Sequence, residues 1–331
     1  MFPRSVTVQR AWLIFNPVAG RYPPTPFVKR AAAVLREHGW RVRLIPTRSG
    51  ETITRMARRA ARRGIEAVFV AGGDGSVGLA AAGLMGSQTA LGILPAGTAN
   101  VFAQDLGLAR MSWVRWTGLE ESARLLANAP VYQVDMGRCN GRPFLLWAGT
   151  GLDAVVVQKV EPRRRWEKVF GIAKYATYAV WTASTWSGMR LQVEVEGFRS
   201  EGEFVMAVAT NIPRFAGGLT QLAPHARLDD GQMDLWLFRG HSFNDIARTA
   251  WMLWLGRLEE IPGAVHLTFR EARIMGKGHL PFQLDGEPVL CAPETTLEVL
   301  PHALRLLVPP GTRHLFVHPP AAAPAFTAPT S

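Results

Sequence analysis

Cysteine is scarce in this 331-residue chain, which contains only Cys139 and Cys291. Two cysteines this far apart give neither a disulfide framework nor a cluster with zinc-ligand spacing, so a disulfide-stabilised secreted scaffold and a zinc module are not expected. A reducing, cytoplasmic location fits this usage. No secretory signal is visible either, because the first apolar run is short and leads directly into a loop at Asn16 that the fold needs.

Long apolar runs are also missing. The most apolar stretch, residues 169–186, contains Lys174 together with tyrosine, threonine and serine, and its length is borderline for crossing a bilayer. We therefore expect a buried or surface helix over about residues 165–187. The tail at 319–331 is rich in proline, alanine and threonine, with too little apolar periodicity to pack, and is predicted to be disordered.

Acidic residues are outnumbered: the chain has 26 Asp and Glu against 37 Lys and Arg, for a formal net charge of +11. Such a balance favours an acidic partner, which could be a nucleotide, a nucleic acid or an anionic membrane surface. Nucleic acid is the least favoured of the three, because no motif that reads DNA or RNA can be recognised. With 48% apolar residues, the chain is long enough for a sizeable core and for two domains.

The pattern of apolar residues changes near Val131. Before it, from Trp12 to about Asn128, strand-like and helix-like segments alternate, which predicts a parallel sheet covered by helices. Beyond it, short alternating strands predict an antiparallel β domain, with a helix that begins at Ser242 and is capped with Asp245. The strands expected in this second half are 192–196, 203–209, 233–238, 264–274, 296–300 and 304–308.

Three loops that contain glycine each follow an apolar strand, at 16–20, 72–76 and 97–100. Glycines let the backbone approach a ligand closely, amides at a helix start attract anions, and Asp74 could hold Mg²⁺ against phosphates. Because the carboxyl ends of parallel strands meet at one edge of a sheet, the loops would form one crevice, with a nucleotide polyphosphate as its first candidate ligand. Taken alone, the glycines at 72–75 also suit an ordinary tight turn.

These loops and one later segment share an order and spacing: Asn16-Pro17-x-x-Gly20, Gly72-Gly73-Asp74-Gly75-Ser76, Pro95-x-Gly97-Thr98-x-Asn100-x-Phe-Ala, and Asp285-Gly286-Glu287-Pro288. Together they resemble the diacylglycerol kinase catalytic-domain family, which includes bacterial lipid kinases, sphingosine kinases and ceramide kinases. The resemblance extends over about residues 8–318.

The resemblance implies a fold in two parts. The first is an α/β domain with a parallel sheet, of the NAD kinase and diacylglycerol kinase type, over 1–130, with 309–318 as a candidate addition. The second is an antiparallel β-sandwich that takes the lipid substrate, over 131–308, whose last strands return toward the first domain. The nucleotide would lie in the cleft between them, flanked by second-domain loops at 149–153 and 211–218.

The resemblance also implies roles for single residues. Asp74 would bind Mg²⁺ and the ATP phosphates, and Glu287 would accept the proton of the lipid hydroxyl. From spacing alone, Asp74 could instead be an Asx-turn cap, and 285–287 is ordinary hairpin chemistry. The complete nucleotide site would consist of Asn16, Pro17, Gly20, Thr47, Gly72, Gly73, Asp74, Gly75, Ser76, Gly97, Thr98 and Asn100.

A structural Mg²⁺ is implied at a third acidic segment, through Asp230 and the backbone carbonyls of Arg227 and Gln232. Few protein ligands are needed, since Mg²⁺ keeps several waters. From spacing alone, residues 229–233 look like one more hairpin turn.

The chain departs from the family at positions expected near the acceptor. Val101 and Gln104 replace an aspartate and an arginine, and Gly78-Leu79 replaces an Asn-Glu pair that often follows the glycine loop. These changes bear on the substrate more than on the nucleotide. They leave a nucleotide-binding regulatory protein without turnover as one alternative reading.

The leading hypothesis is an ATP- and Mg²⁺-dependent kinase for the hydroxyl of a membrane lipid, diacylglycerol or a related glycerolipid first, with a sphingoid base as an alternative. A soluble NAD kinase is the nearest other enzyme, but the segments at 16–20 and 97–100 favour the lipid group. Peripheral docking on an anionic membrane would suit the eleven tryptophans, of which Trp181, Trp186, Trp251 and Trp254 fall on expected helices. Core packing is the commoner fate of tryptophan. The oligomeric state is left open, a homodimer included.

Overall fold

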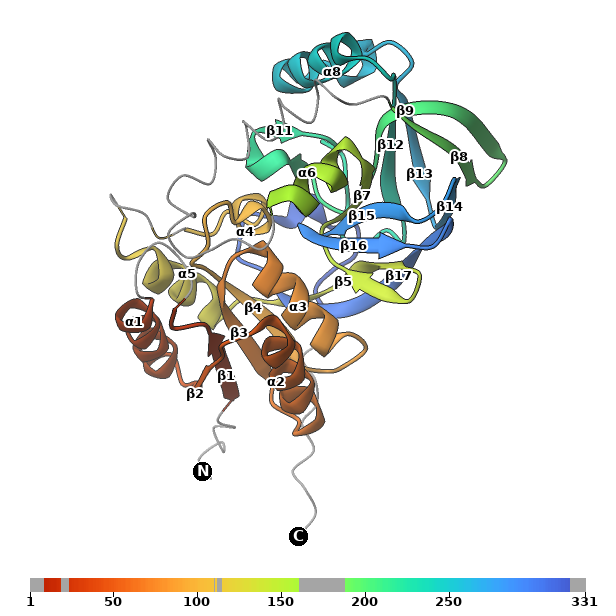
Figure 1. Ribbon diagram of the computed structural model, residues 1–331. Helices are drawn as coiled ribbons and strands as arrows, with labels where there is room; N and C mark the ends of the chain where they lie inside the picture. Colours follow the sequence, from red (N-terminus) through yellow and green to blue (C-terminus); the bar gives the residue numbers. More distant parts are fainter. Residues whose placement is uncertain (1–8, 19–23, 110, 112–114, 161–187, 322–331) are drawn as a thin grey trace, which may run out of the picture.

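The structure is a computed structural model that describes residues 9–18, 24–109, 111, 115–160 and 188–321 (Figure 1). Gly20, the helix expected over 165–187 with Trp181 and Trp186, and residues 322–331 of the expected disordered tail lie outside these ranges.

The N-terminal half is a parallel sheet in the order β2-β1-β3-β4, as the alternating pattern predicted. Helices α1 and α5 pack together on one side of it, and α2 and α3 pack together on the other (Figure 1). With both faces covered, β3 and β4 are buried along almost their whole length. The elements are β1 (Arg10–Phe15), α1 (Thr25–Glu37), β2 (Arg41–Pro46), α2 (Gly50–Arg62), β3 (Ala67–Gly72), α3 (Asp74–Leu84), β4 (Ala90–Pro95), α4 (Val101–Asp105) and α5 (Gly118–Ala127).

The second half is antiparallel, so the predicted fold class is confirmed in both halves. Its strands are β5 (Val131–Cys139), β6 (Arg142–Phe144), β7 (Trp147–Gly151), β8 (Met189–Val195), β9 (Phe198–Thr210), β10 (Arg214–Phe215), β11 (Thr220–Gln221), β12 (Met233–Arg239), β13 (Val265–Phe269), β14 (Glu271–Gly276), β15 (Leu280–Leu284), β16 (Glu287–Cys291) and β17 (Glu294–Leu307). In the part of this half that the structure describes, there are also two helices, α6 (Leu152–Val160) and α8 (Phe243–Leu255), and the 3₁₀ turns η2 (Ala216–Gly218), η3 (Leu258–Glu260) and η4 (Arg313–Leu315).

Three strand expectations were wrong in detail. Residues 264–274 form two strands, β13 and β14, rather than one. The segments at 296–300 and 304–308 are one strand, β17, because a bulge with His302 at φ 53° lets it continue. The acidic turn at 229–233 does not close a hairpin, since β12 pairs with β9 and β13 and not with the preceding β11.

Strand β17 joins the two halves, as the resemblance implied for the last strands. It pairs antiparallel with β5 along most of its length, and its residues Arg305 and Leu306 pair parallel with Ala90 and Leu91 of β4. The sheet is therefore continuous from β2 into the antiparallel half.

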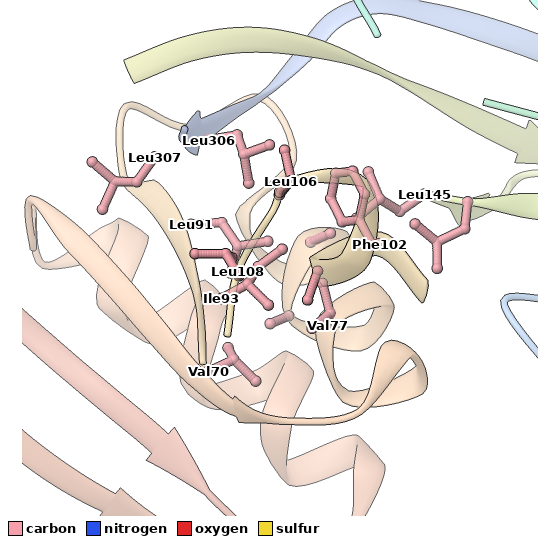
Figure 2. Packing of buried hydrophobic residues seen from close by; sticks show 14 of the residues in the cluster. Val70, Val77, Leu91, Ile93, Phe102, Leu106, Leu108, Leu145, Leu306 and Leu307 are labelled. Atoms are coloured by element: carbon pink, nitrogen blue, oxygen red, sulfur yellow. The ribbon is translucent and has the colours of Figure 1, made fainter. Parts of the chain in front are cut away.

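One buried cluster crosses the junction between the halves. Figure 2 shows Val70 and Leu91 of the parallel strands together with Phe102 of α4, and Leu145 and Leu306 of the second half. All five side chains are almost fully buried. Separating the halves would expose this apolar surface to water, so we expect them to move as one body.

The two cysteines lie in contact despite their separation in the sequence. Cys139 ends β5 and Cys291 ends β16, and both are buried free thiols with their Sγ atoms 3.7 Å apart. Their neighbourhood is the core of the antiparallel half.

No helix in the described ranges has both the length and the apolar character that a bilayer crossing requires.

Candidate active site

The topology places the glycine loops together. Strand β1 leads through α1 to β2 on one side, whereas β3 leads through α3 to β4 on the other, so the chain changes direction between β1 and β3. In α/β sheets such a switch point opens a crevice at the carboxyl ends of the strands. Phe15 pairs with Ala71, and Gly72 pairs with Pro95, so the three loops begin side by side at this edge.

The second and third loops touch through glycine backbones. A Cβ atom on Gly97 would lie 2.4 Å from the Cα atom of Gly73, a separation that no side chain permits. Gly72 is equally constrained, because a Cβ atom there would lie 2.6 Å from the Cβ atom of Ser76. Gly73 and Gly97 are therefore needed for the close approach of the two loops, and Gly72 is needed for the turn into α3. The sequence predicted a close approach of the glycines to a ligand, and that stays a prediction.

Asp74 is the first residue of α3 and reaches across to α4. Its Oδ2 accepts a hydrogen bond from the amide of Val101 at 3.0 Å, and its Oδ1 accepts one from the amide of Phe102 at 3.2 Å. The carboxylate therefore caps a helix on the neighbouring loop rather than its own turn. Burial raises the pKa of Asp74, and the amides at Val101 and Phe102 act against that rise.

Other predicted nucleotide residues shape the loops themselves. Asn100 takes a left-handed conformation, and its buried side chain accepts from the amide of Gly97 at 2.9 Å and donates to the carbonyl of Gly97 at 2.8 Å. Thr47 is buried at the end of β2, where its hydroxyl donates to the carbonyl of Phe15 at 3.2 Å. Direct nucleotide contacts by these two side chains stay predictions.

Each of the three loops also offers a less constrained polar side chain. Asn16 accepts from the amide of Val18 at 3.0 Å and so begins an Asx turn that includes Pro17. Thr98 is exposed at the crevice edge, and Ser76 lies half-buried in the first turn of α3. These are the hydroxyls that phosphate oxygens could reach.

The hairpin β15–β16 brings Glu287 to the glycine loop from more than 200 residues away in the sequence. Asp285 and Gly286 both have positive φ, at 51° and 84°, which is the geometry of a two-residue hairpin turn. Glu287 follows the turn and is exposed; its Oε1 lies 3.4 Å from the position that a Cβ atom on Gly75 would take. Of the two acids with predicted roles, Asp74 therefore lies within the glycine loop and Glu287 lies beside it.

Asp285 fixes this hairpin against the second half. Its Oδ2 accepts from the amide of Leu145 at 2.8 Å, and its Oδ1 accepts from the amides of Leu146 and Trp147 at 2.7 and 3.2 Å. Because the carboxyl is buried, its pKa rises to about 6 in spite of these donors, and the charge of Asp74 adds to the rise. The charge of Asp74 therefore acts on the carboxyl of Asp285.

Two more acids lie at the site: Asp105 escaped the sequence reasoning, whereas Asp153 was expected only as part of the loop at 149–153 that faces the cleft. Asp105, on α4, is ion-paired with Arg214 of β10 at 2.9 Å, and burial raises its pKa to about 6 with a further contribution from Asp74. Asp153, on α6, accepts from the side chain of Gln283 at 2.9 Å, and burial raises its pKa to about 6. The Asp105–Arg214 pair had no local signal, since its partners come from opposite halves of the chain.

The crevice therefore gathers carboxylates around an amide-rich loop. Within the described ranges, no three His, Cys, Asp or Glu residues stand close enough to hold a metal ion by themselves. A divalent ion here would need ligands from elsewhere, and phosphate oxygens are its usual partners in nucleotide sites. The buried charges of Asp74, Asp105 and Asp285 would each be stabilised by such an ion–nucleotide pair.

The acidic segment at Asp230 lies apart from the crevice, in the loop before β12. Asp230 is exposed, and its Oδ1 accepts from the amide of Gln232 at 3.0 Å. Its pKa is raised, first by partial desolvation in the loop and then by the charges of Asp234 and Asp229. Arg227 and Gln232 flank it, both half-buried, so the implied oxygen ligands are near one another in the chain and a cation would relieve the repulsion.

The residues that depart from the family pattern each make a specific contact in the structure. Val101 is buried in the core and uses its amide to bind Asp74. Gln104 donates to the carbonyl of Ala99 at 2.8 Å and packs against Gly218, where a Cβ atom would come within 2.8 Å of it. Gly78 lies against Asp285: a Cβ atom there would be 2.5 Å from Oδ2 of that carboxylate.

Gly78→Ala should lower the free energy of unfolding by about 1–3 kcal/mol, although glycine to alanine inside a helix normally stabilises. The added methyl group has no room, because three backbone amides hold the carboxylate of Asp285 in place. Urea denaturation checks this. Gly75→Ala is the matched control in the same helix, since its Cβ atom would meet only the end of Glu287 at 3.4 Å; equal stability changes in the two variants would contradict the contact.

The comparisons with known proteins agree with this geometry. A family model for the diacylglycerol kinase catalytic domain matches residues 10–139, and one for a YegS C-terminal NAD kinase beta sandwich-like domain matches residues 147–308. A protein of Chromohalobacter salexigens named as a probable lipid kinase YegS-like is 32% identical over 314 residues, which cover 91% of this chain and 94% of that protein. A probable lipid kinase YegS of Salmonella newport is 28% identical and covers 86% of this chain and 91% of its own length.

Solved structures match the fold. A diacylglycerol kinase from Bacillus anthracis superposes with a TM-score of 0.69 at 20% identity, covering 92% of this chain and 98% of its own. An NAD kinase from Archaeoglobus fulgidus, solved in complex with ATP, superposes with a TM-score of 0.53 at 11% identity, covering 93% and 96%. The family models and the relatives named as probable lipid kinases confirm the expectation of a kinase, and the solved structures confirm the two-part fold. The four motifs, the hairpin that carries Glu287 to the glycine loop, and the two family matches agree, and the chain belongs to the diacylglycerol kinase catalytic-domain family.

Proposed function

We propose that this kinase transfers the γ-phosphoryl group of ATP to a hydroxyl of a membrane lipid, with diacylglycerol or a related glycerolipid as the first candidate acceptor. The observation that carries the proposal is the position of Glu287 beside Gly75, the residue that follows the half-buried Asp74 in the glycine loop. Membership of a diacylglycerol kinase family supports the choice of donor and acceptor class.

The residues at the crevice divide the chemistry between them. The amides of the loops at 72–76 and 97–100 would bind phosphate oxygens, and the hydroxyls of Ser76 and Thr98 would add donors. Glu287 would take the proton of the acceptor hydroxyl as it attacks, because an alcohol is a weak nucleophile at neutral pH. Mg²⁺, which Asp74 would hold together with the phosphates, supplies counter-charge for the transferred group.

We propose that each half of the chain binds one of the two substrates. Residues 1–130, with 309–318 as a candidate addition, would bind the nucleotide, and residues 131–308 would bind the acceptor. The contacts of the later segment are with the second half: the ring of Phe316 packs on Tyr132 with the centroids 4.2 Å apart, and the amides of Val317 and His318 donate to Asp229.

The test is an incubation of pure protein with radiolabelled ATP and Mg²⁺, supplied in parallel with a total lipid extract, dispersed diacylglycerol, a sphingoid base and NAD. We expect the label on a glycerolipid. Label on the sphingoid base would change the proposed acceptor to another lipid of this family's substrates. Label on NAD alone would replace the lipid kinase proposal by a soluble NAD kinase.

We further propose a structural Mg²⁺ at Asp230 and the carbonyls of Arg227 and Gln232. In the absence of nucleotide, Mg²⁺ at 100 times its Kd should stabilise the fold by about 2.7 kcal/mol, because an ion that binds only the native state adds its binding free energy. Asp230→Asn should abolish this increment. Thermal denaturation with and without Mg²⁺ measures it, and Asp74→Asn is the control that should keep it; an increment that survives in Asp230→Asn contradicts the site.

A further inference from the structure

Helix α8 stands at the outer end of the antiparallel half (Figure 1). It begins at Ser242 in a capping box, in which Ser242 and Asp245 satisfy each other's backbone amides, and ends at Gly256 in the left-handed conformation. Only Ile246 and Thr249 of this helix are buried. Most of its surface therefore faces solvent.

The solvent face of α8 is apolar, which is the reverse of an ordinary surface helix. Phe243, Trp251 and Trp254 recur at helical spacing and are 50%, 57% and 65% exposed, and the rings of Trp251 and Trp254 lie 5.1 Å apart. Leu255 ends the helix, and Leu219 precedes β11 beside it; they are 42% and 78% exposed. We call these five residues the α8 surface.

Charge distinguishes the partners that could cover the α8 surface. The exposed side chains of α8 include one charged group, Arg248, and no carboxylate, since Asp245 is turned into the cap. The chain as a whole carries +11. Apolar and aromatic side chains beside a cation match the interface of an anionic bilayer, where tryptophan rings rest at the headgroup level. The exposed carboxylates nearest along the chain, Glu259 and Glu260, follow the helix in η3, and Glu260 is ion-paired with Arg257.

The charge of the chain, rather than the size of the α8 surface, argues against a second copy as its partner. An aromatic side chain offers about 150–250 Å², so three that are half to two-thirds exposed, with two leucines, present roughly 500–600 Å². A standard protein interface buries about 800 Å² from each partner, somewhat more than half of it apolar, so this area would suffice for either occupant. Two copies that each carry +11 would repel each other, whereas an anionic bilayer attracts the chain.

The α8 surface is tied to the active site by a short series of contacts. The hydroxyl of Thr220 on β11 donates to the carbonyl of Leu253 on α8 at 2.6 Å, and β11 pairs with β10. Arg214 of β10 is ion-paired with Asp105 of α4, the helix whose amides bind Asp74. A surface on α8 thus has a fixed place relative to the wall of the crevice.

We propose that the α8 surface is the face with which this enzyme docks on anionic bilayers, by insertion of Trp251 and Trp254 into the interface. The inference rests on the proposed function, since a lipid acceptor has to be taken from a membrane. It assigns the docking to this helix rather than to the basic surface in general.

The test uses vesicles of phosphatidylcholine alone and with phosphatidylglycerol, both free of any acceptor lipid, so that binding is read without turnover. We expect the full chain to cosediment with the anionic vesicles and to be released by salt. The double variant Trp251→Ala/Trp254→Ala should bind at least about tenfold more weakly, since the loss scales with the apolar area withdrawn from the bilayer. Trp116→Ala, at a tryptophan 40% exposed in the other half, is the control and should bind as wild type.

Turnover with detergent-dispersed diacylglycerol separates the two proposals. The double variant should keep wild-type turnover there, because no bilayer is involved, and equal melting temperatures would show that it is folded. Wild-type vesicle binding by the double variant overturns the docking role, as does failure of the wild type to bind anionic vesicles while it phosphorylates dispersed lipid. Loss of binding in the double variant, with no lipid phosphorylated by the wild type, supports the docking surface and rejects the lipid kinase proposal instead. If the double variant differed from the wild type in sedimentation velocity but not in vesicle binding, the α8 surface would be a contact with a second copy of the chain.

Discussion

Asp74→Asn should lower kcat/KM by about 10³-fold, which corresponds to about 4 kcal/mol of lost transition-state stabilisation. Asp74 is the half-buried carboxylate of the glycine loop, and its charge contributes to the raised pKa of both Asp105 and Asp285. Asparagine has nearly the same shape but cannot neutralise a metal ion. Steady-state kinetics with dispersed lipid would measure the loss.

The same substitution weakens a cap, so stability must be measured beside activity. In the wild type, the amides of Val101 and Phe102 each donate to one oxygen of the carboxylate. Asparagine has a single acceptor oxygen, so the free energy of unfolding should fall by about 1–2 kcal/mol. Asp245→Asn, which loses similar capping contacts on α8 away from the crevice, should lose stability but keep turnover on dispersed lipid. Normal turnover in a folded Asp74→Asn protein would show that the carboxylate is only a cap.

Glu287→Gln should lower kcat by about 10²–10⁴-fold, the typical contribution of a positioned general base. Glutamine keeps the size and the hydrogen-bonding reach of the side chain but cannot accept the proton. Since Glu287 is exposed at the hairpin turn, the fold should be unaffected. ATP affinity, measured by calorimetry, should change little, because the proton acceptor acts on the lipid and not on the nucleotide.

The matched control is Glu294→Gln, an exposed glutamate at the start of β17 in the same half of the chain. It should leave kcat unchanged. If Glu287→Gln turns over normally, or if its loss appears in the melting temperature rather than in kcat, the glutamate is a structural hairpin residue.

The parallel half was predictable because its signals are local. Three of its four strands, β1, β3 and β4, are short apolar runs that end in a loop with glycine, and Asp74 stands directly at the start of the helix that follows β3. The capping box at Ser242 and Asp245 was likewise predicted from two residues three positions apart, and the structure confirms it. Short-range geometry of this kind can be read from one sequence.

The antiparallel half was harder because its pairings are distant. Strand β17 was split in two at Pro301, since no local signal shows that a bulge carries the strand on to join β4. The contact between Cys139 and Cys291 has the same cause, as does the ion pair of Asp105 with Arg214. Only the motif around Asp285 predicted a position near distant residues. That prediction came from the family pattern and not from the hairpin chemistry.

The central claim is that Asp74 and Glu287 serve one phosphoryl-transfer site with a lipid acceptor. It is tested most directly by single-turnover transfer of label from γ-labelled ATP to dispersed diacylglycerol, with wild type, Asp74→Asn and Glu287→Gln compared at saturating nucleotide. The account predicts label on the lipid hydroxyl with the wild type and a slowing of at least about 10²-fold with each variant, while Glu287→Gln still binds ATP. Transfer by either folded variant at the wild-type rate, or a wild type that labels no lipid, would contradict it.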